Sequence, residues 1–233
     1  MATEVQHSGV KVESRDVVRV RMPAPMVLRG VPYELYVALR DLEENDKIRM
    51  TYHDGVLELM SPEFLHEFPA QRLNKIVSAV AEIFDMPCLD VGNLTIRRGG
   101  KPFKKGHGKE PDCGFYFANA ERTFAKKSVD LDAGDPPPDL WIETDNRGSS
   151  KGRLPTYAAL GVPEVWRYRA TRNELWFGRL TNESTYETID RSLSLPMLTP
   201  VLVLEALALG ESLLDSPWLT RLRAWIGEKL AKP

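Results

Sequence analysis

Apolar and polar residues alternate on both sides of Asp54-Gly55, in the stretch KIRMTYHDGVLELM. This pattern is typical of a β-hairpin, because a tight two-residue turn needs positive φ at both central positions and Asp-Gly tolerates it. Such a turn pairs Tyr52 with Leu57 on the face that we expect to be buried. It leaves Glu58 on the opposite face, where the side chain can line a site.

Other stretches repeat with a period of 3.6 residues, which predicts helices. The longest helix is expected to open at Ser61-Pro62 and to carry an apolar stripe to about residue 84. Shorter helices are expected at residues 33–44, at 151–160 and in the tail from residue 200. Two tryptophans on the last stripe suggest docking on the body of the protein or on a second subunit, so a homodimer is one expectation. Strands are expected at residues 88–96, 113–118, 139–145, 163–168, 174–179 and 185–189.

The order of these elements predicts an α/β fold, since a hairpin and a helix are followed by strands with an intervening helix. We expect a central mixed β-sheet flanked by helices, with an N-terminal hairpin and C-terminal helices. Residues 1–28 are polar and poorly periodic, which predicts a flexible arm. Residues 29–233 are expected to form a single domain, because 233 residues are enough to bury one large core.

Composition narrows the class of protein. The formal net charge is -2 and 27% of the residues are charged, so any binding of nucleic acid needs a local basic patch. No apolar run is long enough to span a membrane, and the first ten residues lack the apolar core of a secretory signal. The two cysteines, Cys88 and Cys113, form no metal-binding motif. We therefore expect a cytoplasmic protein that has no membrane partner.

The strand expected at 139–145 carries an unusual number of acids. Asp139, Glu143 and Asp145 lie on one face of it, together with a tryptophan. Carboxylates so close repel one another, and burial costs them solvation, unless a cation or a basic side chain lies among them. Lys151 and Arg153 follow within a few residues and can supply that charge. The alternative is a solvated strand end that carries surface salt bridges.

A second acid precedes another strand. In Glu110-Pro111-Asp112 the proline fixes the approach to the strand, which places Asp112 at its end. An enzyme that hydrolyses phosphodiesters with a metal needs two or three carboxylates around a hard cation such as Mg²⁺. Asp112 and Glu143 are the candidate ligands, and Asp145 is either a third ligand or a residue that supports the other two.

The stretch RRGGKPFKKGHGK, residues 97–109, is basic and rich in glycine. Beside an acidic centre, such a stretch can contact a phosphate backbone. The alternative is an ordinary solvated loop. Its cations are Arg97, Arg98, Lys101, Lys104, Lys105 and Lys109.

Four segments together resemble the Uma-two-like putative restriction endonuclease family: DGVLELMSP, EPD, PPDLWIE and KGRLPTYAALGVPEVWRY. The resemblance covers roughly residues 30–210 and implies the restriction-endonuclease-like core of PD-(D/E)xK nucleases. It implies that Asp112 is the Asp of the Pro-Asp motif and that Glu143 is the acid of the (D/E)xK motif, with Mg²⁺ or Mn²⁺ as cofactor. Glu58 and His66 match the acidic and histidine positions near the first helix. From the residues alone, His66 is as readily a core histidine as a member of the site.

The chain departs from that motif at one position. Two residues after Glu143, where the motif has lysine, stands Asp145. The basic residue of the family matches Arg153, on the following helix, with Lys151 two residues earlier. Arginine can stabilise charge and orient a phosphate, but it stays protonated and cannot act as a base.

Three hypotheses follow for the function. The first is a Mg²⁺- or Mn²⁺-dependent endonuclease that cleaves DNA phosphodiester bonds, in which Lys151 or Arg153 contacts the scissile phosphate. The second is a catalytically silent nuclease fold that binds nucleic acid or protein, which the acid at the lysine position favours. The third is a dimerising scaffold. Because fold does not fix function, the geometry and chemistry of the site are needed to choose among these hypotheses.

Overall fold

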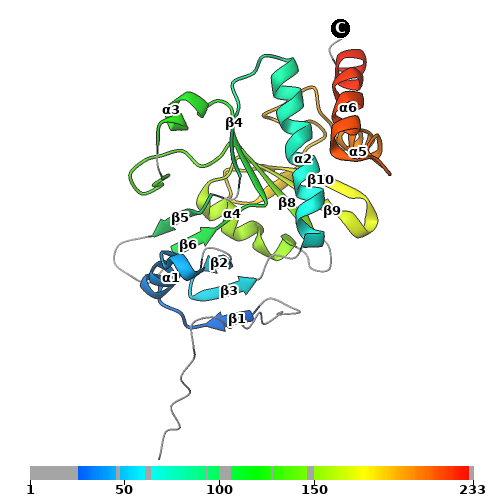
Figure 1. Cartoon of the computed structure of the whole chain (residues 1–233). Helices are drawn as coiled ribbons and strands as arrows, with labels where there is room; N and C mark the ends of the chain where they lie inside the picture. The colour runs from blue at the N-terminus through cyan, green and yellow to red at the C-terminus, as the bar shows by residue number, and fades with distance from the viewer. Residues whose placement is uncertain are drawn as a thin grey trace, which may run out of the picture.

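The computed structural model describes residues 26–45, 48–60, 64–92, 94–99, 106–126, 128–145 and 150–230; for Glu44 and residues 64–67 it describes the backbone alone. Two β-sheets organise this part of the chain, and helices pack around them (Figure 1). The mixed α/β class is confirmed. The sequence pattern predicts one central sheet, and the structure adds a second one.

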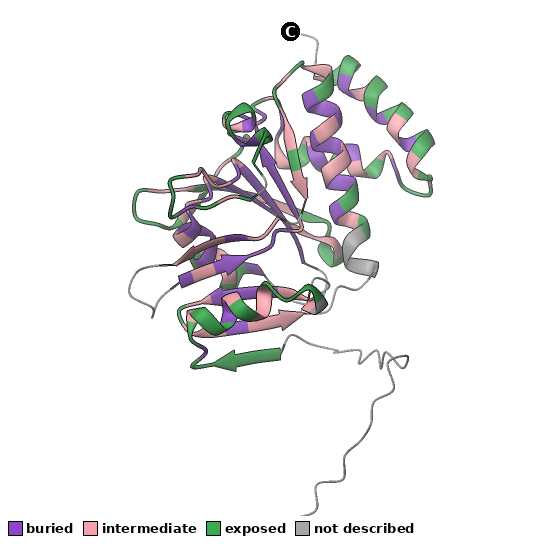
Figure 2. Cartoon of the chain, turned by 60° about the vertical axis from the view of Figure 1, so that its left-hand side comes forward, coloured by how far each residue is buried: buried purple, intermediate pink, exposed green. Residues whose placement is uncertain are grey.

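The larger sheet has six strands in the order β11-β10-β9-β8-β7-β4. β8 and β9 run parallel and the other neighbours are antiparallel, so the sheet is mixed, as predicted. β8 lies inside the sheet, and all of its residues are buried (Figure 2). The strands are β4 (Leu89–Gly92), β7 (Cys113–Tyr116), β8 (Leu140–Asp145), β9 (Glu164–Arg169), β10 (Glu174–Leu180) and β11 (Tyr186–Thr188).

The smaller sheet is antiparallel, in the order β1-β3-β2-β6-β5. The predicted hairpin is β2–β3, and its register is confirmed: Tyr52 faces Leu57, and Asp54 and Gly55 have φ of 42° and 89°. Residues 26–28, the last three of the predicted flexible arm, belong to β1, and residues 1–25 lie outside the described part. The strands are β1 (Met26–Arg29), β2 (Arg49–His53), β3 (Val56–Met60), β5 (Ile96–Gly99) and β6 (Gly106–Lys109).

The basic stretch contributes two strands, although the sequence pattern predicted none there. Its two described ends are β5 and β6, which pair with each other, and β6 also pairs with β2. The glycines serve close packing here. A Cβ atom at Gly106 would overlap the Tyr33 ring, and one at Gly108 would overlap the Tyr36 hydroxyl. The strands can therefore approach α1 (Tyr33–Arg40) only because these positions lack a side chain.

Helices cover the larger sheet, and α2 packs against β7 and β8 (Figure 1). α6 packs on α2, so the tail docks on the body of its own chain; a homodimer stays a prediction. α4 joins the parallel strands β8 and β9 and also contacts β5 and β6 of the smaller sheet. The helices are α1 (Tyr33–Arg40), α2 (Phe64–Ile83), α3 (Ala120–Phe124), α4 (Leu154–Leu160), α5 (Pro200–Ala208) and α6 (Asp215–Lys229). Turns of 3₁₀-helix lie at Glu43–Asn45, Ser150–Arg153 and Ala170–Arg172.

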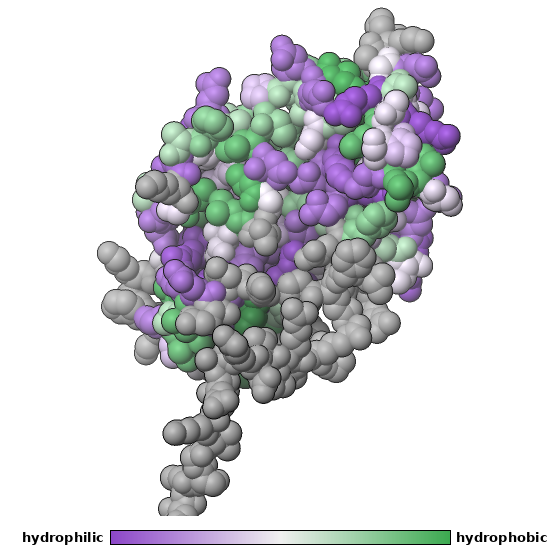
Figure 3. All heavy atoms as spheres, viewed as in Figure 1, coloured by the Kyte–Doolittle hydropathy of each residue, from purple (hydrophilic) through white to green (hydrophobic). Residues whose placement is uncertain are grey.

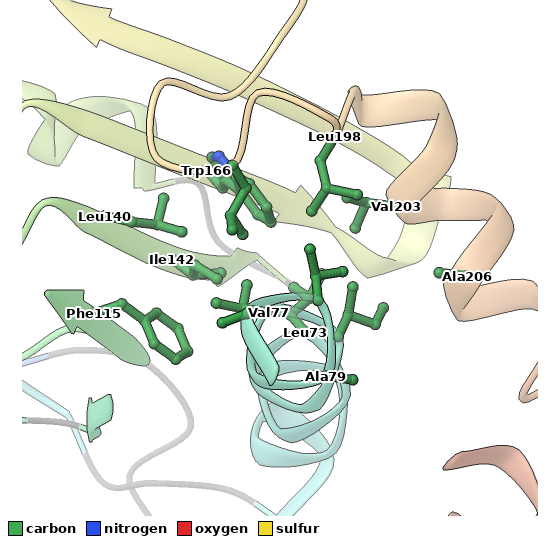
Figure 4. Close-up of a cluster of buried hydrophobic side chains, with 14 of the residues drawn as sticks. Leu73, Val77, Ala79, Phe115, Leu140, Ile142, Trp166, Leu198, Val203 and Ala206 are labelled. Carbon is green, nitrogen blue, oxygen red and sulfur yellow. The ribbon is translucent and has the colours of Figure 1, made fainter. Parts of the chain in front are cut away.

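The main core lies between α2, the larger sheet and α5 (Figure 4). Leu73 and Val77 of α2 meet Ile142 of β8 and Trp166 of β9 there. Within the described residues, every helix is too short or too polar to span a bilayer. The face seen in Figure 3 mixes hydrophilic and hydrophobic residues.

Candidate active site

The alternation along β8 sends its residues to two different environments. Ile142 lies in the core beneath α2, whereas Trp141 lies in a separate cluster with Tyr157 of α4. Glu143 therefore points to the α4 side, where the two sheets meet. Its side chain is 3% exposed, and it accepts a hydrogen bond of 2.7 Å from Trp141 Nε1.

The Glu143 carboxylate is surrounded by charge. Lys109 Nζ, from β6 of the smaller sheet, lies 3.4 Å from Glu143 Oε1. Burial raises the pKa of the Glu143 carboxyl above its ordinary value; the Lys109 charge opposes this rise and the Asp112 charge adds to it. The Lys109 charge thus favours the ionised form of this carboxyl.

Asp112 lies next to Glu143 through strand pairing. It directly precedes β7, whose Cys113 pairs with Ile142 of β8. Asp112 Oδ2 accepts hydrogen bonds from the amide and hydroxyl of Thr144, at 2.7 and 2.8 Å, and Oδ1 accepts one of 2.6 Å from Arg49. The structure therefore brings together the two acids that the sequence assigned to metal binding.

Glu58 and Arg153 form the rim of the site. Glu58 points from β3 as the hairpin pattern predicts, and its Oε2 accepts a hydrogen bond of 3.1 Å from Arg153 Nε. Burial disfavours the charge on Arg153, but Tyr157, Glu143 and Glu58 outweigh burial and raise its pKa. Arg153 is thus a fixed positive charge between the acids. Lys151, in the same 3₁₀ turn, is exposed.

Asp145 is held in a separate arrangement, although it shares a strand face with Glu143. It accepts hydrogen bonds from the Ser150 amide at 2.7 Å and from Arg167 at 2.8 Å. Asp139, at the other end of the acidic strand, accepts from the amides of Phe117 and Asn119. Both acids therefore organise turns of the chain.

The predicted nucleic-acid-binding residues separate in the structure. Arg97 pairs with Asp41 at 2.8 Å, and Arg98 donates to the Ala159 carbonyl at 2.9 Å. Lys109 lies at the floor of the site and is 3% exposed. Lys101, Lys104 and Lys105 lie outside the described residues, as does the side chain of His66.

Sequence reasoning missed two members of the site, Arg49 and Tyr157, and gave Lys109 a different role. Arg49 lies two residues before Thr51, which pairs with Glu58, so the hairpin pattern placed it on the site face. Tyr157 is fully buried, and its hydroxyl has no hydrogen-bond partner among the described residues. Burial raises the pKa of Tyr157, and the Glu143 charge raises it further.

Asp112 and Glu143 are the two carboxylates that could hold a divalent metal ion. Mg²⁺ is commonly held by one or two carboxylates together with waters and substrate phosphates, and Asp112 and Glu143 supply such a pair. The described residues contain no group of three or more His, Cys, Asp or Glu side chains that could hold a metal. Each acid of the site instead has a cationic partner: Asp112 with Arg49, Glu143 with Lys109, Glu58 with Arg153 and Asp145 with Arg167.

Comparison with known proteins identifies the family. The family model Uma2, described as "Putative restriction endonuclease", matches residues 34–210, which is most of the chain, so the chain belongs to this family. The resemblance noted from the sequence is thereby confirmed. A crystal structure of "a putative nuclease belonging to DUF820" from Anabaena variabilis matches with a TM-score of 0.49 and 13% identity, over 81% of this chain and 99% of that one. The chain has no match among the curated proteins.

Proposed function

We propose that the protein is a divalent-metal-dependent endonuclease that hydrolyses DNA phosphodiester bonds. The observation that carries this proposal is the position of Asp112, directly before β7, beside Glu143 on the neighbouring strand β8. Bound there, Mg²⁺ or Mn²⁺ would supply a water of lowered pKa and neutralise charge on the phosphate. Membership of a restriction-endonuclease family supports the same chemistry.

We assign a separate role to each of the surrounding residues. Arg153 and Arg49 are each 18% exposed, whereas Lys109 is 3% exposed, so contact with a phosphate is assigned to the two arginines. Glu58 holds Arg153 in place through their ion pair. Asp145 serves as a positioning residue, because its bond to the Ser150 amide fixes the turn that leads to Arg153.

The remaining assignments are residues that would contact the DNA backbone or complete the site. Lys151 is exposed in the same 3₁₀ turn as Arg153 and suits contact with a neighbouring phosphate. Lys101, Lys104 and Lys105 keep the role that the sequence suggested, as contacts to the DNA backbone. His66 keeps its assignment at the site, on the first helix after the hairpin.

The pairing of every acid with a cation favours a second candidate function. A site whose charges already balance needs no metal for stability, which suits a silent nuclease fold that only binds nucleic acid. The two candidates differ in a plasmid assay. Supercoiled DNA nicked with Mn²⁺ or Mg²⁺ but intact with EDTA supports the enzyme. Intact DNA under all these conditions, with binding that weakens steeply as salt rises, supports the silent module.

A further inference from the structure

Lys109 occupies a position that its place in the sequence did not suggest. It lies in the basic stretch, where we expected contact with solvent and phosphate, but its side chain is 3% exposed. β6 holds it between two neighbours, because Lys109 pairs with Thr51 of β2 and with Ile96 of β5. Its Nζ donates to the Glu110 carbonyl at 2.6 Å and lies 3.4 Å from Glu143 Oε1.

The position where the nuclease motif has its lysine cannot serve in that role. Asp145 stands there, and it is bound by Ser150 and Arg167. Arg153, the alternative from the next helix, is paired with Glu58. The ammonium that reaches the central acid therefore comes from the other sheet.

We infer that Lys109 takes the place of the motif's lysine, supplied from β6 instead of from the strand of Glu143. This inference rests on the proposed function. Lys109 would act in two ways: it holds one carboxylate oxygen of Glu143 through their ion pair, and it adds a positive charge beside the acids.

The geometry leaves the ammonium one further donor. A lysine ammonium has three N–H groups. The Glu110 carbonyl accepts a hydrogen bond from one of them and Glu143 Oε1 lies within ion-pair distance, and the described residues hold no further partner of the ammonium. A phosphate oxygen or a water beside Glu143 can accept the third. Lysine suits this position better than arginine, because its charge is compact and its donors can rotate.

The test compares Lys109→Met, Lys109→Arg and wild type, with Lys75→Met as the matched control. Lys75 pairs with Asp215 between α2 and α6, outside the site. Mn²⁺ binding is measured by titration calorimetry at pH 8, nicking is measured on supercoiled plasmid, and thermal unfolding verifies that each variant is folded. A lysine that serves only the fold would change stability, Mn²⁺ binding and nicking in the same direction.

The inference predicts opposite changes in Mn²⁺ affinity and in nicking when Lys109 is replaced. Lys109→Met should bind Mn²⁺ roughly tenfold more tightly, because a repelling charge near the ion is lost. Its nicking should nevertheless fall by roughly 100-fold, as when one charge-stabilising donor is removed from an active site. Lys109→Arg keeps the charge and should recover part of the nicking, and Lys75→Met should match wild type.

Two other results would overturn the inference. One is wild-type nicking by folded Lys109→Met; the other is Mn²⁺ affinity that does not change in this variant. If wild type itself never nicks DNA, the proposed function fails, and the Mn²⁺ titration then decides the role of Lys109 alone.

Discussion

The unpaired hydroxyl of Tyr157 gives a prediction whose sign is unusual, because the substitution should stabilise the protein. Tyr157→Phe keeps the ring, which packs against Trp141 at 5.3 Å between centroids, and removes only the buried oxygen. A buried hydroxyl without a hydrogen bond costs about 1–3 kcal/mol. Part of that gain is lost to the small void left behind. The free energy of unfolding should therefore rise by about 1–2 kcal/mol, which is roughly 2–8 °C in Tm for a chain of this size.

Tyr52→Phe is the matched control, because it is the same chemical change at another fully buried tyrosine. The Tyr52 hydroxyl donates a hydrogen bond of 2.8 Å to the Val31 carbonyl. Removing it leaves that carbonyl without this donor, so the free energy of unfolding should fall by about 1–3 kcal/mol. The two variants should shift stability in opposite directions.

The assay is urea denaturation at pH 7, followed by far-UV circular dichroism so that ring fluorescence does not interfere. The urea concentration at the midpoint of unfolding should rise for Tyr157→Phe and fall for Tyr52→Phe. The slope of the unfolding free energy against urea should stay the same in both variants. A loss of stability in Tyr157→Phe as large as that in Tyr52→Phe would refute the reasoning, since the hydroxyl would then have a partner in solution. Lower nicking by the stabilised variant would show that the hydroxyl serves a bound ligand.

Three further outcomes are expected in the same denaturation assay. Gly108→Ala should lose about 1–3 kcal/mol, because the new methyl group overlaps the Tyr36 hydroxyl in the core; a neutral result would contradict that contact. Burial and a neighbouring histidine lower the pKa of His107 below 6.5, so the unfolded chain binds more protons. Stability should therefore fall as pH drops below about 6.5, and His107→Gln should flatten this dependence; an identical slope in the variant would argue against it. Arg72→Met should lower the free energy of unfolding by about 2–4 kcal/mol, because Arg72 is buried and donates to two carbonyls beside α6. Arg223→Met removes an exposed ion pair and should change stability little. Equal losses in the two variants would refute this distinction.

Local patterns predicted the parts of the fold that depend on near neighbours in the sequence. The Asp54-Gly55 turn fixed the register of the hairpin, and that register placed Glu58 on the face of the site. Alternation along β8 likewise placed Glu143 and Asp145 on one face. Both predictions needed only the geometry of a strand and a turn.

Pairings between distant segments could not be predicted in this way. Nothing local indicates that β6 adds to β2, and this pairing is what carries Lys109 beneath Glu143. The charge on Lys109 suggested a solvated loop, because a buried lysine is rare unless it is paired. Asp145 is similar, since its partner Arg167 comes from the parallel strand β9. The identity of each acid's cation is thus a property of the tertiary structure.

The central claim is that Glu143 binds the catalytic metal ion, and one comparison tests it directly. Plasmid nicking with Mn²⁺ is measured for wild type, Glu143→Gln and Glu164→Gln. Glu164 is a matched control, because it is buried on the adjacent strand and accepts a 2.7 Å hydrogen bond from the Trp166 indole, as Glu143 does from Trp141. Replacing a residue that only supports a metal ligand typically costs about 10–100-fold in activity. Glu143→Gln changes the ligand itself, so its nicking rate should fall by at least that much. Glu164→Gln should keep the wild-type nicking rate. Nicking by Glu143→Gln at the wild-type rate would contradict the claim.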